Sequence, residues 1–352
     1  MQSVQTQGAN MRKLLNTLYI STQGAYLHKD GETIVVEIEK EKKSYPIHII
    51  GSIVCFGNVL VSPFLMGFCA ERGVSVSFLT EYGKFLASVR GAVNGNVLLR
   101  REQYRMADNE LVTKQVAQNI ISGKLANSRV VLNRLLRDHE SKVDSEKVRQ
   151  ASSLLEHYIR KVSQATSSDE VRGYEGESGA VYFGAFDNLI LEQKDDFKFT
   201  ERSRRPPLDE INAMLSFVYT ILSHDVRSAL ETVGLDSQVG FLHRDRSGRH
   251  SLALDLMEEF RSVIADRLVL SLINRRQISK KDFEKSASGA VNMSEKSRKI
   301  LLTEWQNRKQ EEVYHPYIEE KVKIGLLFFV QANLLARFIR GDIDGYPPFF
   351  WR

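Results

Sequence analysis

The sequence predicts an α+β protein in which a small β-rich N-terminal domain is followed by a larger all-α domain. Short runs of β-branched and aromatic residues, separated by turn residues, fill positions 16–93. From Leu98 onward, apolar residues recur at the spacings of three and four that amphipathic helices require. A length of 352 residues also favours two domains over one.

The N-terminal domain is expected to contain hairpins and one helix. Asp30-Gly31 lies between two apolar runs, 25–28 and 33–38, which is a strong hairpin signal. A helix is expected from Pro63 to Arg72, with Gly73 closing it. Further strands are expected at 17–20, 42–50, 51–56, 74–80 and 85–89.

The C-terminal domain is expected to be helical almost throughout. Its periodic segments are 112–131, 154–162, 211–222, 260–273, 300–305 and 318–339, and Gly341 is expected to close the last of them. The two domains should join within residues 90–105. We therefore divide the chain into a polar, disordered tail (1–10), a β-rich domain (11–97) and a helical domain (98–352).

Composition narrows the class of protein. The only two cysteines, Cys55 and Cys69, lie in apolar runs, so we expect buried free thiols. Two cysteines exclude a disulfide framework and a cysteine-based zinc site, which fits a cytoplasmic protein. No apolar window reaches the length of a membrane span, and the first ten residues lack the layout of a signal peptide.

Positive charge is concentrated in the second half of the chain. The formal net charge is +5, a mild excess that separates no class of protein by itself. The clusters comprise Arg202, Arg204, Arg205, Arg244, Arg246, Arg249, Arg275, Arg276, Lys280, Lys281, Lys296, Arg298 and Lys299. Such clusters are typical of a polyanion site, although any single one can equally be a solvated helix face.

The segment 173–183 combines an acid with three glycines inside a helical pattern. Each glycine costs a helix interior about 1 kcal/mol relative to alanine. A helix tolerates this cost where another backbone or a phosphate must come close. The small residues leave Glu175 in a space without bulk, although a surface acid on a loosely packed helix is the ordinary alternative.

A histidine and two acids follow further along the chain. His243 comes after an apolar run and before a basic loop; such a histidine is more often a hydrogen-bonded core residue than a ligand. Asp255 and Glu258 stand at an expected helix start and face one side of it. Asp-x-x-Glu also has the form of a capping box, in which both acids serve only the helix. One histidine with several carboxylates suits Mg²⁺ or Mn²⁺, while His250 keeps zinc open.

Several segments, in this order, resemble a known family. They are Met-Arg-Lys-Leu-Leu-Asn-Thr-Leu-Tyr-Ile at 11–20, the Glu-Gly segment 175–183, Arg-Pro-Pro-Leu-Asp-Glu-Ile-Asn-Ala-Met-Leu-Ser at 205–216, 234–259, and Tyr-Pro-Pro-Phe at 346–349. Over residues 11–352 the chain resembles the CRISPR-associated endonuclease and integrase of spacer acquisition, most closely its subtype I-C version. Ser178-Gly179 and Ser237 depart from the family's usual residues, and we expect these departures to affect local stability more than activity.

The resemblance implies a β-sandwich-like domain that dimerises and a helical, metal-dependent catalytic domain. It places one divalent ion, Mg²⁺ or Mn²⁺, on Glu175, His243 and Glu258. It puts Asp255 beside the metal, so Glu175, His243, Asp255 and Glu258 are the expected catalytic residues. From the residues themselves we also expect Asp255 to cap its helix. The implied partners are DNA, a second copy of the chain, and a small ferredoxin-like CRISPR protein that completes a heterohexamer.

The implied activity is insertion of a DNA fragment into a CRISPR array. A 3′-hydroxyl attacks a phosphodiester, and water in its place makes the same site a nuclease. The residues expected to grip DNA phosphates are Arg205, Arg244, Arg246, Arg249, Arg275 and Lys280. Asn212, Ser216 and Tyr219, on one side of a helix, are expected to support the site.

Two other functions remain open from the residues. A non-enzymatic DNA- or RNA-binding protein of a defence complex needs the basic clusters without the acids and the histidine. A metal hydrolase of small molecules needs the acids without the arginines. Dependence on a divalent metal and on salt concentration distinguishes these alternatives.

Overall fold

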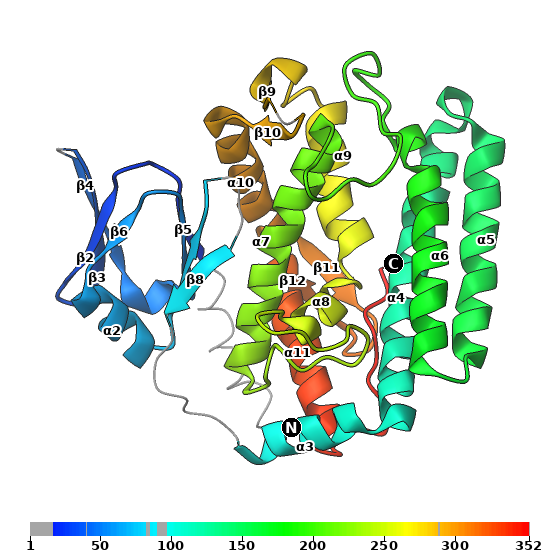
Figure 1. Cartoon of the computed structure of the whole chain (residues 1–352), viewed down its shortest axis with the longest axis horizontal. Coiled ribbons are helices and arrows are strands. Elements are labelled where there is room, and N and C mark those ends of the chain that lie inside the picture. Colours follow the sequence, from blue (N-terminus) through cyan, green and yellow to red (C-terminus); the bar gives the residue numbers. More distant parts are fainter. Residues whose placement is uncertain (1–16, 40, 82–84, 90–96, 288, 352) are drawn as a thin grey trace. The chain divides into compact units, whose positions relative to one another are not determined.

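The computed structural model describes residues 17–39, 41–81, 85–89, 97–287 and 289–351. The chain divides into two compact units, residues 1–95 and 96–352 (Figure 1). The domain boundary expected after residue 97 is two residues later than the observed division after residue 95. The expected tail 1–10 and most of the opening segment 11–20 lie outside the described residues.

Within the described residues, the N-terminal unit has two four-stranded sheets. The order in one sheet is β1 (Thr17–Ile20), β5 (Ser52–Phe56), β7 (Ser75–Leu79) and β8 (Phe85–Val89), with only the β7–β8 pair antiparallel. The order in the other is β4 (Glu41–Pro46), β3 (Thr33–Ile38), β2 (Tyr26–Asp30) and β6 (Leu60–Val61), with only the β2–β6 pair parallel.

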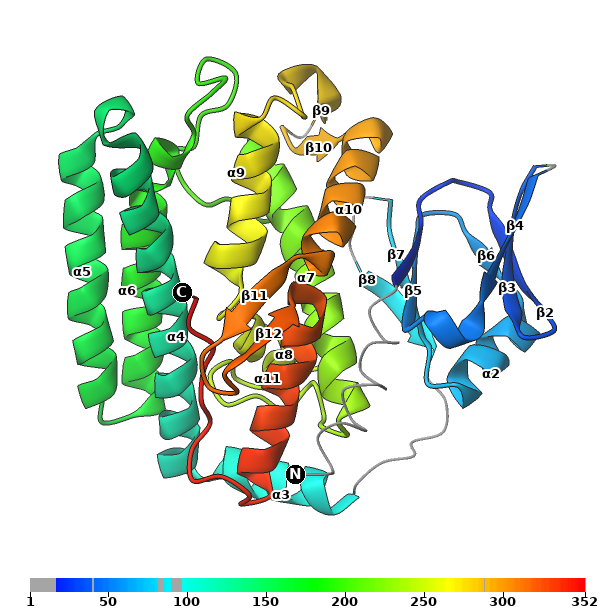
Figure 2. The same ribbon diagram turned by 180° about the vertical axis from the view of Figure 1, so that it is seen from behind.

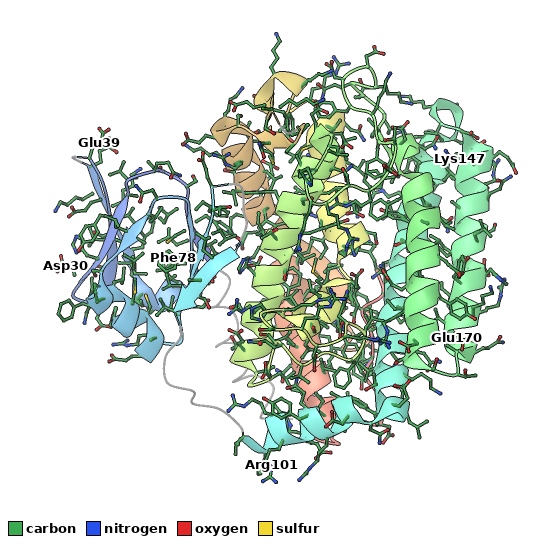
Figure 3. The ribbon with its side chains drawn as sticks, viewed as in Figure 1. Asp30, Glu39, Phe78, Arg101, Lys147 and Glu170 are labelled. Atoms are coloured by element: carbon green, nitrogen blue, oxygen red, sulfur yellow. The ribbon has the colours of Figure 1, made fainter. Side chains whose placement is uncertain are left out.

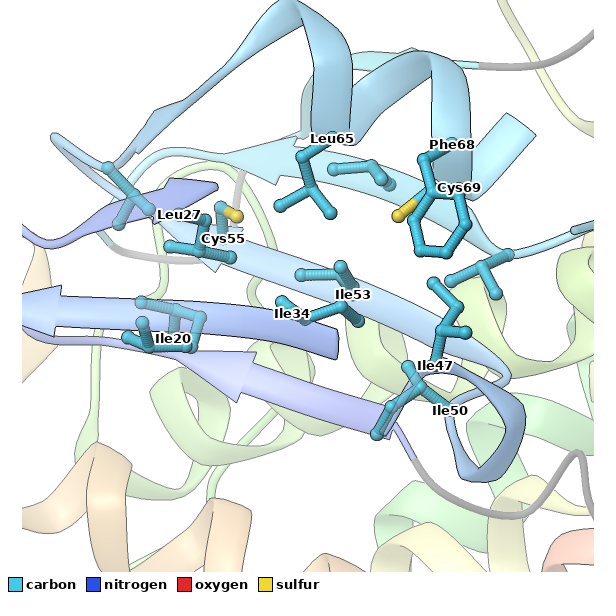
Figure 4. Packing of buried hydrophobic residues seen from close by; sticks show 14 of the residues in the cluster. Ile20, Leu27, Ile34, Ile47, Ile50, Ile53, Cys55, Leu65, Phe68 and Cys69 are labelled. Atoms are coloured by element: carbon cyan, nitrogen blue, oxygen red, sulfur yellow. The ribbon is translucent and has the colours of Figure 1, made fainter. Parts of the chain in front are cut away.

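One hydrophobic core joins both sheets to helix α2 (Pro63–Glu71) (Figure 4). Ile53 and Cys55 of β5 pack in the same cluster as Leu27 and Ile34 of the second sheet. All five residues of β5 are buried, as expected for a central, mostly apolar strand covered on both faces. This unit is therefore a β-sandwich closed by one helix.

Local signals in this unit are confirmed with one exception. Asp30 pairs with Thr33 in the β2–β3 hairpin, and Gly31 has a φ of +54°, which glycine adopts without steric cost. Ser62 caps α2, and Gly73 follows that helix with a φ of +70°. The expected strand 42–50 is wrong beyond Pro46, because proline has no amide to continue a ladder and Ile47–Ile49 forms a 3₁₀ turn.

The C-terminal unit is helical, which confirms the predicted fold class. Its α-helices are α3 (Val97–Asp108), α4 (Glu110–His139), α5 (Ser145–Gln164), α6 (Ser168–Gly184), α7 (Glu210–Thr232), α8 (Ser251–Met257), α9 (Arg267–Asn274), α10 (Glu295–Gln310) and α11 (Ile324–Ile339). A π-helical turn, η5 (Arg261–Asp266), precedes α9, and 3₁₀ turns lie at η3 (Glu140–Lys142), η4 (Phe186–Leu189) and η6 (Lys280–Asp282).

This unit also contains two short antiparallel hairpins that the periodicity does not predict. They pair β9 (Phe283–Lys285) with β10 (Val291–Met293) and β11 (Glu312–His315) with β12 (Glu320–Lys323). The expected helix 318–339 is therefore wrong at its start, where β12 takes the place of the first helical turns. None of the described helices is long and apolar enough to cross a membrane.

The long helix α4 holds the parts of the unit that matter for the site. It packs against α5 and α6 on one side and against η5 and α8 on another (Figures 1 and 2). The start of α6 is held by side chains: Ser167 accepts from the Glu170 amide, and Glu170 accepts from Tyr174 and Thr166 (Figure 3). Helix α4 thus contacts both α6 and α8.

Candidate active site

Asp255 organises the loop that carries the candidate histidine. Its side chain is fully buried, and its carboxylate accepts backbone hydrogen bonds from Phe241 (2.6 Å), Leu242 (2.9 Å) and His243 (2.8 Å). Gly240 lies against the same carboxylate, since a Cβ there would stand 2.8 Å from Asp255 Oδ2. The loop can wrap around Asp255 only because this position has no side chain.

The expected helix cap at Asp255 is wrong. Helix α8 begins at Ser251, four residues earlier, so Asp255 lies inside the helix and Glu258 stands at its C-terminal end. Asp-x-x-Glu therefore forms no capping box here. The carboxylate of Asp255 instead serves the amides of a separate loop, which no local pattern reveals.

His243 is oriented by the same acid. Its Nδ1 lies 2.6 Å from Asp255 Oδ1, and 24% of its side chain is exposed. A carboxylate on one ring nitrogen fixes the orientation of the imidazole and leaves Nε2 for a ligand or a proton. This is the arrangement that metal-binding histidines commonly have.

Glu258 is almost fully buried between two cations. Its carboxylate lies 2.7 and 2.9 Å from Arg261 Nη1 and 2.8 Å from Lys124 Nζ, and only 5% of its side chain is exposed. Burial alone raises the pKa of this carboxyl, but the charges of Arg261 and Lys124 outweigh burial and hold the pKa well below its usual range. The carboxylate is therefore ionised at neutral pH.

Glu175 meets Glu258 through Lys124. The Lys124 ammonium, on α4, forms an ion pair with Glu175 Oε1 on α6 as well as with Glu258 Oε2. The side chain of Lys124 is 11% exposed and that of Glu175 is 31% exposed. Three helices thus bring two carboxylates from positions 83 residues apart in the sequence to one cation.

The glycines around Glu175 face open space, and no other part of the described chain packs against them. A Cβ added at Gly173, Gly176 or Gly179 would meet nothing within 4 Å. The expected close approach of another backbone is therefore not found within the described chain. Gly179 and Ser178 instead line a small pocket beside Lys124.

A second layer of polar groups supports Glu258. The Arg261 guanidinium lies 4.4 Å from the centre of the Tyr219 ring, and Tyr219 and Tyr182 donate hydrogen bonds to Asp266 at 2.5 and 3.0 Å. Burial raises the pKa of Asp266 to about 6, although these hydrogen bonds and Arg261 oppose it.

The other two expected supporting residues bind a different cation. Asn212 and Ser216 accept hydrogen bonds from Arg202, whose guanidinium lies 5.4 Å from the Tyr219 ring centre. Asn212 and Ser216 therefore reach the site only through Arg202 and Tyr219.

Lys124, Arg261 and Asp266 are parts of the site that the sequence analysis does not identify. Lys124 does carry a signal, because it falls on the stripe of α4 that also contains Val116 and Ile120, both fully buried. A charged residue on a buried helical stripe requires a partner of opposite charge. Arg261 and Asp266 lie inside the expected helix 260–273, where the pattern gives no reason to single them out.

Two of the three expected metal ligands, Glu175 and Glu258, meet at Lys124, and the third, His243, lies close enough to Glu258 to help lower the pKa of that carboxyl. Glu175 and Glu258 supply carboxylate oxygens and His243 a ring nitrogen, the donor types that Mg²⁺ and Mn²⁺ accept. Among the residues that the structure describes, no group of three or more His, Cys, Asp or Glu side chains gathers closely enough to hold a metal. A divalent ion on both glutamates therefore requires the Lys124 ammonium to move away.

The six candidate DNA-binding residues divide into separate groups. The pKa of Arg249 is lowered mainly by burial, and the charges of Arg246 and Arg205 nearby lower it further. Arg244 is paired with Asp169 at 2.6 Å. Lys280 faces Asp196 at 4.0 Å. The pKa of Arg308 is lowered mainly by burial, and the nearby charge of Arg275 adds to that effect. Of the six, Arg205, Arg246 and Arg249 therefore form one cluster, which adjoins the loop held by Asp255.

Comparison with known proteins decides the family. The model of the family described as CRISPR associated protein Cas1 matches residues 18–307. The chain belongs to the Cas1 family. The expected family resemblance is thereby confirmed, while the assignment to subtype I-C stays a prediction.

Similar proteins match this Cas1 family member along nearly its whole length. CRISPR-associated endonuclease Cas1 1 of Chlorobaculum tepidum is 56% identical over 343 residues, which cover 97% of this chain and all of that protein. A solved Cas1 protein from Thermotoga maritima is 25% identical with a TM-score of 0.80, covering 93% of this chain and 97% of that chain. A casposase bound to an integration product shares the fold at 24% identity, with a TM-score of 0.81 and coverages of 94% and 92%.

Proposed function

We propose that this Cas1 family member is a metal-dependent DNA endonuclease and integrase that inserts DNA fragments into a CRISPR array. The observation that carries the proposal is the meeting of Glu175 and Glu258 on one cation beside a pocket. His243, held by Asp255, completes the donor set. The relative in Chlorobaculum tepidum is named an endonuclease, and its 56% identity supports the same class of activity here.

The proposed ligands of one Mg²⁺ or Mn²⁺ ion are Glu175, His243 and Glu258. Such an ion supplies a Lewis acid that stabilises the negative charge growing on a phosphate under attack. Asp255 orients His243, and Arg261 keeps the Glu258 carboxylate ionised and in place. Arg205, Arg246 and Arg249 are proposed to hold flanking phosphates, which fixes the position of the DNA without reading its sequence.

The proposed reaction is a transesterification. The oxygen of a DNA 3′-hydroxyl forms a bond to phosphorus while the bond from phosphorus to the leaving 3′-oxygen breaks. The attacking hydroxyl releases one proton and the leaving oxygen takes up one, so the phosphodiester count is unchanged. With water as the nucleophile, the same displacement cleaves the strand.

The proposed partners are DNA, a second copy of the chain and the small ferredoxin-like CRISPR protein, which completes a heterohexamer. Within the family, the chain is proposed to be of the subtype I-C version. On the N-terminal unit, Leu60 and Phe64 are 59% and 86% exposed, and Tyr26, the strand partner of Leu60, is 39% exposed. Large apolar side chains that gather on a surface favour a protein interface. This supports the use of the unit in dimerisation.

The decisive experiment compares Glu258→Gln, Glu175→Gln and His243→Ala with the parent in a strand-transfer assay on branched DNA with Mn²⁺. We expect each variant to lose strand transfer and cleavage by a factor of 100 or more. DNA affinity should stay within about threefold, because phosphate contacts supply most of it. Glu177→Gln, an exposed position on the same helix as Glu175, is the matched control and should retain full activity.

One observation favours the alternative of a non-enzymatic DNA- or RNA-binding protein. Lys124 already pairs with both glutamates, so the acids could serve only to join three helices. In that case Mn²⁺ would change neither DNA cleavage nor strand transfer in the parent. The glutamine variants would then lose thermal stability and no metal-dependent property.

A further inference from the structure

Lys124 and Arg261 together balance the charge of the two glutamates. Lys124 pairs with Glu175 and Glu258, and Arg261 pairs with Glu258 through both carboxylate oxygens. Two positive side chains thus face two negative ones. Removing Lys124 alone would leave one excess negative charge among groups that are largely withdrawn from water, which is costly.

The ammonium stands where the two carboxylates converge. Its side chain comes from α4, and only 11% of it is exposed, so water does not screen these ion pairs well. A divalent ion that binds both carboxylates needs the same oxygens. With Lys124 in place, the group would carry four positive charges against two negative ones. The metal ion and the ammonium therefore compete for one position.

We propose that Lys124 is a resident counter-cation, which holds Glu175 and Glu258 together in the metal-free protein and is displaced when a divalent ion binds. The proposal rests on the proposed function, because it takes these two glutamates as metal ligands. Lys124 lowers the affinity for the metal and, in return, keeps the ligands assembled without it. The site is thereby preformed at the expense of tight metal binding.

Three variants test the role of the charge. Lys124→Gln keeps most of the side-chain length and can still donate a hydrogen bond, but it removes the charge. Lys124→Arg keeps the charge, and a guanidinium binds carboxylates in pairs of hydrogen bonds and stays protonated. Lys114→Gln is the matched control on the same helix, ten residues or about 15 Å before Lys124.

The measurement is a Mn²⁺ titration of the full-length protein followed by electron paramagnetic resonance. We expect Lys124→Gln to bind Mn²⁺ at least tenfold more tightly than the parent. Lys124→Arg should bind Mn²⁺ as weakly as the parent or more weakly, and Lys114→Gln should match the parent. Without metal, Lys124→Gln should melt at a lower temperature than the parent, and Mn²⁺ should raise its melting temperature by more.

Opposite outcomes separate this inference from the proposed function. If Lys124→Gln binds Mn²⁺ no more tightly than the parent, or Lys124→Arg binds it more tightly, the counter-cation role is wrong. If Lys124→Gln does not fold, the Mn²⁺ affinity of Lys124→Arg alone tests the counter-cation role. The parent should bind Mn²⁺, and Glu258→Gln should abolish that binding. If the parent binds no Mn²⁺, or if Glu258→Gln binds it equally well, the proposed metal site is wrong. The proposed function then fails, whatever the role of Lys124.

Discussion

Asp255 illustrates how a single buried residue acquires its role from distant neighbours. Its carboxylate accepts three backbone amides of residues 241–243 and contacts the His243 ring. A carboxylate has acceptor positions for all four groups, whereas an asparagine would turn an N–H₂ group toward one of the donors. The acid is therefore required for the shape of the loop, and through that loop for the position of His243.

Asp266 provides a prediction about pH at the residue scale. Burial raises the pKa of its carboxyl from an ordinary 3.8 to about 6. Between these values the folded protein keeps a proton that the unfolded chain has released, so stability is full below about pH 4 and falls as the pH rises through 6. The loss amounts to about 3 kcal/mol by pH 7.

Asp266→Asn removes this titration. We expect the melting temperature of the variant, relative to the parent, to rise by several degrees between pH 4 and pH 7. Thermal melts followed by circular dichroism at intervals of one pH unit measure the difference. Asp195→Asn, at an exposed loop position, should show a constant difference. A constant difference for Asp266→Asn as well would contradict the raised pKa.

At the scale of elements, the C-terminal segment holds α4 and α8 in place. Tyr346 donates a hydrogen bond to Glu259 at 2.5 Å, and the Phe349 amide donates to the other oxygen of that acid at 2.8 Å. Asn127 of α4 donates to the carbonyl oxygens of both Glu259 and Phe349. Gly123 permits the contact, because a Cβ there would stand 2.9 Å from Pro348 Cβ. The C-terminal segment thus holds Gly123 and Glu259, the chain neighbours of Lys124 and Glu258, in place.

Tyr346→Phe tests this clamp. The change removes one donor from a fully buried acid and one acceptor from Gln331, which donates to the Tyr346 oxygen at 2.7 Å. An unsatisfied buried polar group costs about 1–3 kcal/mol. We expect a melting temperature lower by roughly 3–10 °C, measured by differential scanning calorimetry. Tyr317→Phe, at a side chain that is 48% exposed, should leave the melting temperature unchanged. Equal values for the two variants would show that the clamp adds no stability.

At the scale of the whole molecule, the distribution of arginines predicts how DNA binding depends on salt. Arg205 and Arg246 gather around Arg249, whereas Arg244 has its own partner in Asp169. Cations that lie close together favour a bound polyanion. Each phosphate contact contributes about 0.9 to the slope of log K against log salt for duplex DNA.

Replacing Arg205, Arg246 and Arg249 with glutamine should reduce that slope by about 2–3. Fluorescence anisotropy with labelled duplex DNA at several salt concentrations measures it. The matched control is Arg137, Arg149 and Arg160 together, three exposed arginines on α4 and α5 that already pair with acids. An unchanged slope in the first triple variant would move the DNA track to another face of the molecule, such as that of Arg275.

Hydrophobic patterning and turn residues determined the order of domains in this protein. Alternation, Asp30-Gly31 and Gly73 predict hairpins and a capped helix because these signals act over a few residues. The family resemblance also rests on sequence, and it is confirmed. The hairpin at Glu312–Lys323 escaped prediction because each of its strands has only four residues, too few for the alternation of buried and exposed side chains in the first strand to stand out from the helical segments around it.

Only the tertiary structure decided how the candidate site is assembled. Glu175 and Glu258 are named from sequence, but their junction depends on Lys124, which comes from a third helix. Asp255 looks like a helix cap because local spacing cannot show that a distant loop needs its oxygens. Charges and hydrogen bonds act over a few ångströms in space, and residues far apart in the chain share that distance only after the helices have packed.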